Sequence, residues 1–160
     1  MKVTVNNKQY LATLTKTAEF KERLKTGENY QCVVKDSNST AGVMDFFYDE
    51  VDMSVDVERF KANDFDSANA LFSVLRVFCL KHESMIIESD SLTDANGNVQ
   101  YKQFLDSLNA PDENNFLDDL ESPIVIDKST NAYYITLMDD EENLRNVEGF
   151  SIDNGKGIEK

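Results

Sequence analysis

The chain has 160 residues and carries 30 Asp and Glu against 16 Lys and Arg, for a net charge of -14. This length fits one domain with a sizeable core, and a hydrophobic share of 41% is too high for a disordered chain. The composition argues against a basic nucleic-acid-binding protein, a disulfide-rich scaffold and a membrane-spanning helix.

The first half of the chain predicts several strands. Residues 2–6 and 9–14 are expected to pair as a β-hairpin around Asn6-Asn7-Lys8, because polar turn residues separate two short β-prone segments. Residues 30–35 and 42–48 predict two further strands, separated by polar residues that are typical of a turn.

Between the first hairpin and the next strand, the spacing favours a short helix. Thr17 is a suitable N-cap, and Phe20 and Leu24 lie one helical turn apart. We therefore expect a helix over residues 18–25 that ends near Gly27, where glycine can adopt the left-handed backbone of a helix end.

Residues 51–58 show the clearest alternation in the sequence. Apolar residues at odd positions alternate with Asp52, Ser54, Asp56 and Glu58 at even positions. A period of two predicts a strand with one apolar and one acidic face, as in a sheet that is covered on one side only.

The strongest helical pattern follows. Asp64 or Asp66 can cap it, and the helix is expected to continue to about Lys81 with a wide apolar stripe. His82 lies near its end, where the helix dipole favours a cation, and we expect a structural or surface role for it.

Two cysteines in apolar segments are expected to be reduced core residues. They are Cys32 and Cys79.

The second half predicts short elements. A strand is expected near residues 85–88, helices over 101–108 and 111–121, a hairpin of 124–127 with 132–138, and a last strand over 150–153. The expected fold is therefore α+β: a single compact domain over residues 1–153, with a mainly antiparallel sheet, one long central helix and two or three short helices. Residues 154–160 are expected to form a flexible tail.

Charge is distributed unevenly along the chain. Residues 1–35 hold seven Lys and Arg against three acids, whereas the remaining residues hold nine against 27. The first 35 residues are thus a basic hairpin and helix that we expect to pack on an acidic remainder. One group of acids lies near the alternating strand: Asp45, Asp49, Glu50, Asp52, Asp56 and Glu58. A second group lies on and around the expected helix at 111–121: Asp112, Glu113, Asp118, Asp119 and Glu121.

These acids suggest a binding partner. Carboxylates at alternate strand positions lie about 6.6 Å apart, a spacing comparable with that of neighbouring phosphates along a nucleic-acid strand. One hypothesis is a non-enzymatic inhibitor of phage or mobile-element type, such as an anti-CRISPR or anti-restriction protein. It would bind the basic groove of a cationic nucleic-acid-binding protein, for example a nuclease, with Phe47 as a possible anchor. No direct contact with nucleic acid or membrane is expected.

Three alternatives remain beside this hypothesis. The acidic surface can serve only to keep the protein in solution. The chain can be a phage structural or assembly protein, or an oligomeric accessory protein. An enzyme is the third alternative, because any two of the 30 acids could form a catalytic pair. The sequence does not indicate which two acids these would be.

No motif predicts a metal, a cofactor or a catalytic residue. Asp94 to Asn98 resembles part of a calcium-binding loop, but Leu92 and Gln103 occupy the positions of two required carboxylate ligands, so an Asn-Gly turn is expected. The first residues show no apolar secretion signal, so we expect a cytoplasmic protein, in the host cell if it is encoded by a phage.

Overall fold

The computed structural model describes residues 1–82, 86–89, 124–127, 132–136 and 146–154. Within these residues the chain forms nine strands and one α-helix, an α+β fold. In chain order the elements are β1 (Lys2–Val5), β2 (Lys8–Glu22), β3 (Lys25–Asp36), β4 (Ser39–Asp49), β5 (Ser54–Ala62), α1 (Phe65–Lys81), β6 (Ile86–Ser89), β7 (Ile124–Asp127), β8 (Ala132–Thr136) and β9 (Val147–Glu148).

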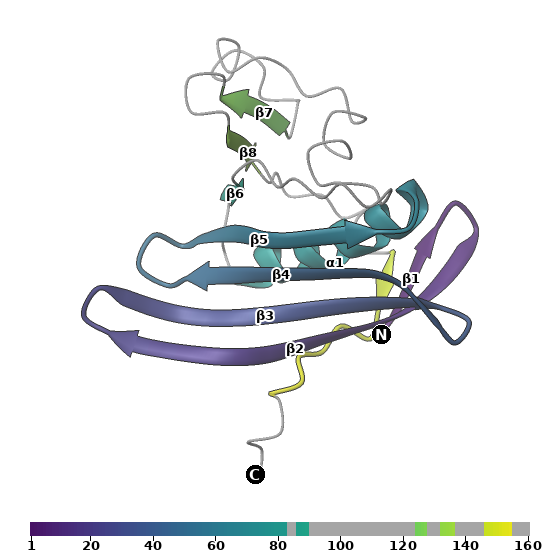
Figure 1. The fold of residues 1–160 in the computed structure, drawn as a ribbon, viewed down its shortest axis with the longest axis horizontal. Helices are drawn as coiled ribbons and strands as arrows, with labels where there is room; N and C mark the ends of the chain where they lie inside the picture. Colours follow the sequence, from purple (N-terminus) through teal and green to yellow (C-terminus); the bar gives the residue numbers. More distant parts are fainter. Residues whose placement is uncertain (83–85, 90–123, 128–131, 137–145, 155–160) are drawn as a thin grey trace.

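The strands form one sheet in the order β7-β8-β6-β5-β4-β3-β2-β1-β9. Neighbouring strands are antiparallel, except that β5 and β6 run parallel and are joined through α1. The helix lies behind the sheet in Figure 1 and packs against β1 to β5. One face of these strands is therefore covered by α1, and the opposite face is the one turned to the viewer. We call this opposite face the outer face.

The first hairpin is confirmed. Asn6 and Asn7 connect β1 to β2, and both have positive φ angles, of 49° and 67°. Two successive left-handed residues define the type I′ turn, whose twist matches that of the flanking strands. Asparagine tolerates this backbone better than most residues, which explains why this pair forms the turn.

The helix expected over residues 18–25 is wrong. Strand β2 continues to Glu22, and the chain turns at Arg23 and Leu24 into β3. The β2–β3 register shifts between Lys16 and Ala18, so a β-bulge interrupts the alternation there. Gly27 ends no helix; it lies within β3, opposite Phe20.

The strand expected over residues 51–58 is correct only from Ser54 onward. Val55 and Val57 are buried under α1, as the alternation predicts. Val51 and Met53 instead belong to the turn before β5, and they are 75% and 42% exposed. Met53 has a φ of 53°, a turn conformation that ends the alternation.

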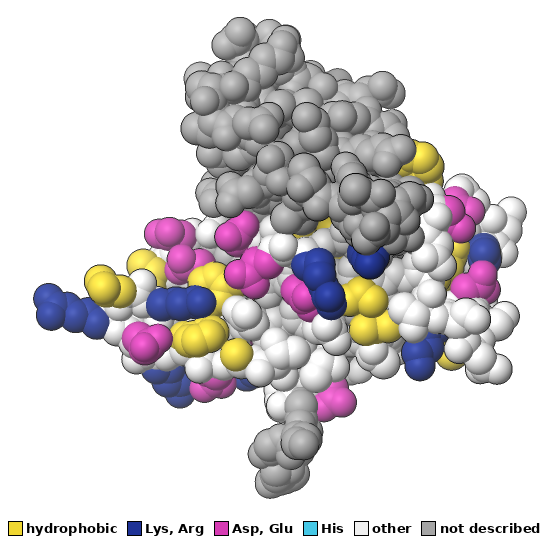
Figure 2. Space-filling model, viewed as in Figure 1, with side chains coloured by type: hydrophobic (Ala, Val, Ile, Leu, Met, Phe, Trp, Pro, Cys, Tyr) yellow, Lys and Arg dark blue, Asp and Glu magenta, His cyan; other side chains and the backbone are white. Residues whose placement is uncertain are grey.

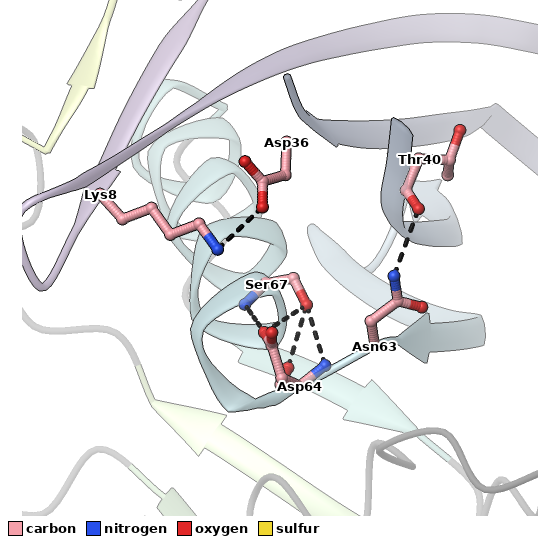
Figure 3. Close-up of polar contacts among 6 residues, drawn as sticks. All are labelled: Lys8, Asp36, Thr40, Asn63, Asp64 and Ser67. Carbon is pink, nitrogen blue, oxygen red and sulfur yellow. Dashed lines mark hydrogen bonds and ion pairs between the residues drawn. The ribbon is translucent and has the colours of Figure 1, made fainter. Parts of the chain in front are cut away.

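Helix α1 has the boundaries that its sequence predicts, with Asp64 as the N-cap. Figure 3 shows the cap: the Asp64 carboxylate accepts the Ser67 N–H at 2.8 Å, and the Ser67 hydroxyl accepts the Asp64 N–H at 3.1 Å. This reciprocal pair satisfies two donors at the helix start. In the same view, Lys8 and Asp36 form an ion pair at 2.8 Å.

An aromatic cluster joins α1 to the sheet. The ring centroid of Phe78 lies 4.8 Å from that of Tyr30 and 4.9 Å from that of Phe46, both edge to face. Cys32 and Cys79 are both buried in the same core, as predicted. Burial raises the pKa of the Cys32 thiol to about 12, which keeps it protonated.

The elements described after α1 agree in part with expectation. The strand at 86–89 and the hairpin of 124–127 with 132–136 are confirmed. The last strand is not at 150–153: β9 pairs with β1, and Asp153 forms one isolated bridge with Thr15. The helices expected over 101–108 and 111–121, and the turn at 94–98, lie outside the described residues. Within the described part of the chain, no helix is both long and apolar enough to cross a membrane.

Candidate functional site

Several of the predicted contact residues lie on the outer face. Phe46 and Tyr48 of β4 are buried on the helix side, so Asp45, Phe47 and Asp49 alternate with them on the other side. Asp56 of β5 lies opposite Phe47 in the register and therefore shares the outer face. The fold thus places these four residues on the same face of the sheet.

The charge of Asp45 is balanced within the sheet. Its carboxylate lies 2.7 Å from Nε of Arg59 and accepts a hydrogen bond of 3.0 Å from the Gln31 amide. A bulge at Glu58 produces this pairing, because the register passes from Val57 opposite Phe46 directly to Arg59 opposite Asp45. Asp45 is therefore part of an ion pair.

Asp49 shapes the turn between β4 and β5. Its Oδ1 accepts the N–H of Val51 at 2.9 Å and that of Asp52 at 3.1 Å. These bonds fix the backbone of the turn, so the carboxylate of Asp49 has a structural role. We use the name β4–β5 turn for residues 50–53. Its exposed side chains are two acids and two apolar residues: Glu50, Val51, Asp52 and Met53. Asp52 is therefore in a turn and not on the strand face where the sequence placed it.

Three carboxylates meet close to this turn. Glu19 and Glu28 are opposite each other on β2 and β3, and the negative charge of Glu28 raises the pKa of Glu50. The Tyr30 hydroxyl donates to the Glu28 carboxylate at 2.6 Å. No pattern in the sequence points to Glu19 and Glu28, because only the strand register shows that they approach Glu50.

Phe47 is partly covered by a neighbouring ring and by a cation. Its ring centroid lies 6.1 Å from that of Phe20, in an edge-on arrangement across Gly27. The ammonium of Lys25 lies over both rings, at 4.1 Å from Phe20 and 4.8 Å from Phe47. Leu24 in the adjacent turn is 96% exposed and is the most exposed of the large hydrophobic side chains described at this end of the sheet.

The outer face carries charges of both signs. Figure 2 shows acids, Lys and Arg side chains and apolar side chains interspersed over the strands. Residues 1–82 hold 11 Lys and Arg against 12 Asp and Glu, so this part is nearly neutral. Residues 83–160 hold five against 18, so they carry almost all of the net negative charge. The acids predicted at 112–121 belong to that part and lie outside the described residues.

The structure also locates the residues considered for chemistry. His82 ends α1, its ring stacks on Phe78 at 3.8 Å, and its Nδ1 lies 2.9 Å from the Phe78 carbonyl oxygen. These contacts give His82 the structural position that was expected. Among the described residues, no group of three or more His, Cys, Asp and Glu is arranged to hold a metal ion.

Two cavities are lined by described residues. One of about 530 Å³ lies between the β1–β2 turn, α1 and the residue before β9, and the described residues that line it are polar and uncharged apart from Val5. The other, of about 280 Å³, lies between the start of β4 and the end of β5. The first has the size of a small-molecule site.

Comparisons with protein-family models, with curated proteins and with solved structures find no match to this chain.

Proposed function

We propose that this chain is a non-enzymatic interaction protein of phage or mobile-element type. It inhibits a host nucleic-acid enzyme, as anti-CRISPR and anti-restriction proteins do, by occupying the basic groove that otherwise holds phosphates. The partner is a cationic nucleic-acid-binding protein such as a nuclease. The inhibition is electrostatic and steric, and needs no chemistry from this chain.

The exposed β4–β5 turn carries this proposal. It presents apolar Val51 and Met53 in alternation with the acids Glu50 and Asp52, on a backbone that the Asp49 side chain holds in place. Protein interfaces combine apolar anchors at their centre with charged groups around them. A fixed turn also loses little conformational entropy when it binds.

The acidic residues 83–160 support the same partner. Their charge attracts a cationic surface over a distance and raises the association rate. The short helix that the sequence predicts over residues 111–121 would supply a second group of contacts. Its acids are Asp112, Glu113, Asp118, Asp119 and Glu121.

The first experiment is affinity purification of the tagged protein from its native host at low salt, with mass spectrometry of the bound proteins. We expect a stoichiometric nuclease or polymerase that dissociates at high salt, because screening weakens contacts between exposed charges. Recovery of the protein alone, or of virion components, would contradict the proposal and favour an oligomeric accessory or assembly protein.

A matched pair of variants tests the turn. The double variant Val51→Ser/Asp52→Asn changes two exposed side chains and is expected to lower affinity for the captured partner by about tenfold or more. The control Glu148→Gln removes an exposed charge from β9 and should bind as the unaltered chain does. Equal binding by both variants would exclude the β4–β5 turn from the interface.

A further inference from the structure

The cavity of about 530 Å³ has an unusual lining. Four side-chain amides and two hydroxyls surround it, and Val5 is its one apolar residue among those described. The amides belong to Asn6, Asn7, Asn69 and Asn146, and the hydroxyls to Thr4 and Ser73. Each amide offers two donors and one acceptor oxygen, and each hydroxyl can both donate and accept.

Part of this lining is held in a fixed orientation. Nδ2 of Asn6 donates to the Asp66 carboxylate at 2.8 Å, and Nδ2 of Asn69 donates to the Phe65 carbonyl oxygen at 3.1 Å. The Ser73 hydroxyl donates to the backbone carbonyl of Asn69 at 2.8 Å. These bonds leave acceptor capacity on the amide and hydroxyl oxygens, and a ligand need not immobilise the side chains on binding.

The rest of the lining has unused hydrogen-bonding groups. The side chains of Thr4, Asn7 and Asn146 make no hydrogen bond to another residue in the described part of the chain. Asn7 is held in the left-handed region by the β1–β2 turn, which fixes its place at the cavity. The cavity lining therefore combines side chains that are held by hydrogen bonds with side chains whose hydrogen-bonding groups are unused.

The chemistry of the lining selects the ligand. None of the described residues that line it is Lys, Arg, Asp or Glu, so these residues offer no counter-charge to a charged ligand. Val5 alone offers little surface to an apolar ligand. We infer that this cavity binds a small, uncharged, polyhydroxylated molecule, a monosaccharide or polyol, through amide and hydroxyl hydrogen bonds.

This inference does not rest on the proposed function. The β1–β2 turn and the β4–β5 turn lie at opposite ends of the sheet in Figure 1, so the cavity is separate from the β4–β5 turn.

The test is a titration of the ¹⁵N-labelled full chain followed by NMR, with glucose, N-acetylglucosamine and glycerol as separate probes. Each probe is raised to about 50 mM, which covers the millimolar affinity that a few exposed hydrogen bonds support. We expect saturable shifts of the Asn7 and Asn146 side-chain amides with at least one probe. Absence of saturable shifts with all three probes would overturn the inference.

Variants identify the site. Asn7→Gly removes one amide, and glycine readily adopts the φ of 67° that the turn requires. Asn146→Ala removes a second amide. Each change is expected to weaken probe binding by about tenfold, the effect of losing one hydrogen bond of about 1.4 kcal/mol. The control Asn38→Gly alters the turn between β3 and β4, outside the cavity, and should bind normally. Equal binding by all three variants would place the ligand elsewhere and refute the assignment.

Discussion

Gly27 permits the close approach of β3 and β4. Its φ is 156°, a backbone conformation that residues with a side chain rarely adopt, and a Cβ there would overlap the carbonyl oxygen of Tyr48. The same Cβ would lie 2.9 Å from the Phe47 ring. The residue therefore fits this position only because it lacks a side chain.

Gly27→Ala is accordingly expected to lower the free energy of unfolding by about 3 kcal/mol, from steric overlap added to backbone strain. Urea unfolding followed by circular dichroism measures the loss. Gly149→Ala is the matched control, because Gly149 has a φ of 72° but open space around it. Its loss should be about 1 kcal/mol, from strain alone. Similar losses in both variants would show that steric overlap at Gly27 contributes nothing.

Glu50 gives a prediction about pH. The charge of Glu28 raises the pKa of Glu50 in the folded chain above its ordinary value of 4.5, so the ionised pair destabilises the fold at neutral pH. This repulsion disappears as the pH falls through the raised pKa and Glu50 is protonated. Glu50→Gln should therefore raise the melting temperature at pH 7 and leave it unchanged at about pH 3. An equal gain at both pH values would contradict this cause. Glu148→Gln serves as the control for removing an exposed acid.

At the scale of elements, the N-cap of α1 makes a measurable contribution. Asp64→Ala removes the acceptor of the Ser67 N–H and is expected to cost about 1 kcal/mol of stability. The Ser67 N–H also lowers the pKa of Asp64 below its ordinary value of 3.8. The stabilisation is therefore present above that value and is lost as the pH falls through the lowered pKa.

Urea unfolding of the Asp64→Ala variant and the unaltered chain at pH 7 and at about pH 2.5 measures this effect. We expect a difference at neutral pH that shrinks in acid. The neighbouring Asn63→Ala is the control, because its amide makes only a long contact of 3.4 Å with the Thr40 carbonyl oxygen. A loss equal to that of Asp64→Ala would indicate that the cap has no special role.

Local sequence patterns predicted α1 and the first hairpin. The N-cap and apolar stripe of α1, and the two-residue turn of the hairpin, each involve residues that are close together in the sequence. The second half of β2 was unpredictable for a physical reason. The bulge near Thr17 interrupts the period of two, and Phe20 and Leu24 then match helical spacing by coincidence. In the fold Phe20 packs on Phe47, whereas Leu24 points into solvent.

In the candidate site, too, some features follow from sequence spacing and others depend on the strand register. Asp45, Phe47 and Asp49 share one face of β4 because side chains alternate along a strand, an arrangement that depends only on sequence spacing. The Asp45–Arg59 ion pair depends on a bulge in the partner strand, and no pattern in the sequence reveals where that bulge lies. Cross-strand partners are a property of register, so the effective charge of each acid could not be predicted.

At the scale of the whole molecule, the net negative charge is concentrated in one part of the chain. The nearly neutral residues 1–82 contain five of the strands and the described helix, and the acidic charge belongs to residues 83–160. The sequence alone shows this division along the chain. A cationic partner is therefore expected to be attracted mainly by residues 83–160. Its affinity for the nearly neutral strands β1 to β5 is expected to depend on how well the two surfaces fit together.

Strand β1 pairs with β2 only as far as Leu11, so the rest of β2 lies at an edge of the sheet. This edge is protected along part of its length. The Ala12 N–H donates to the Met1 carbonyl oxygen and the Lys16 N–H to that of Asp153, so both chain ends add to this edge. Farther along β2, Lys16 and Lys21 both pair with Glu19, at 3.2 and 3.4 Å. Charged side chains on an edge strand discourage pairing with other chains.

The position of β1 has a consequence for the order of synthesis. One edge of β1 pairs with β2, the next strand to be made, but the other pairs with β9, which is made after β2 to β8. A nascent chain therefore leaves this edge of Lys2 and Val3 unpaired until Val147 and Glu148 have been synthesised. The buried Val3 lies on that edge, so this part of the sheet forms only after β9 has been made.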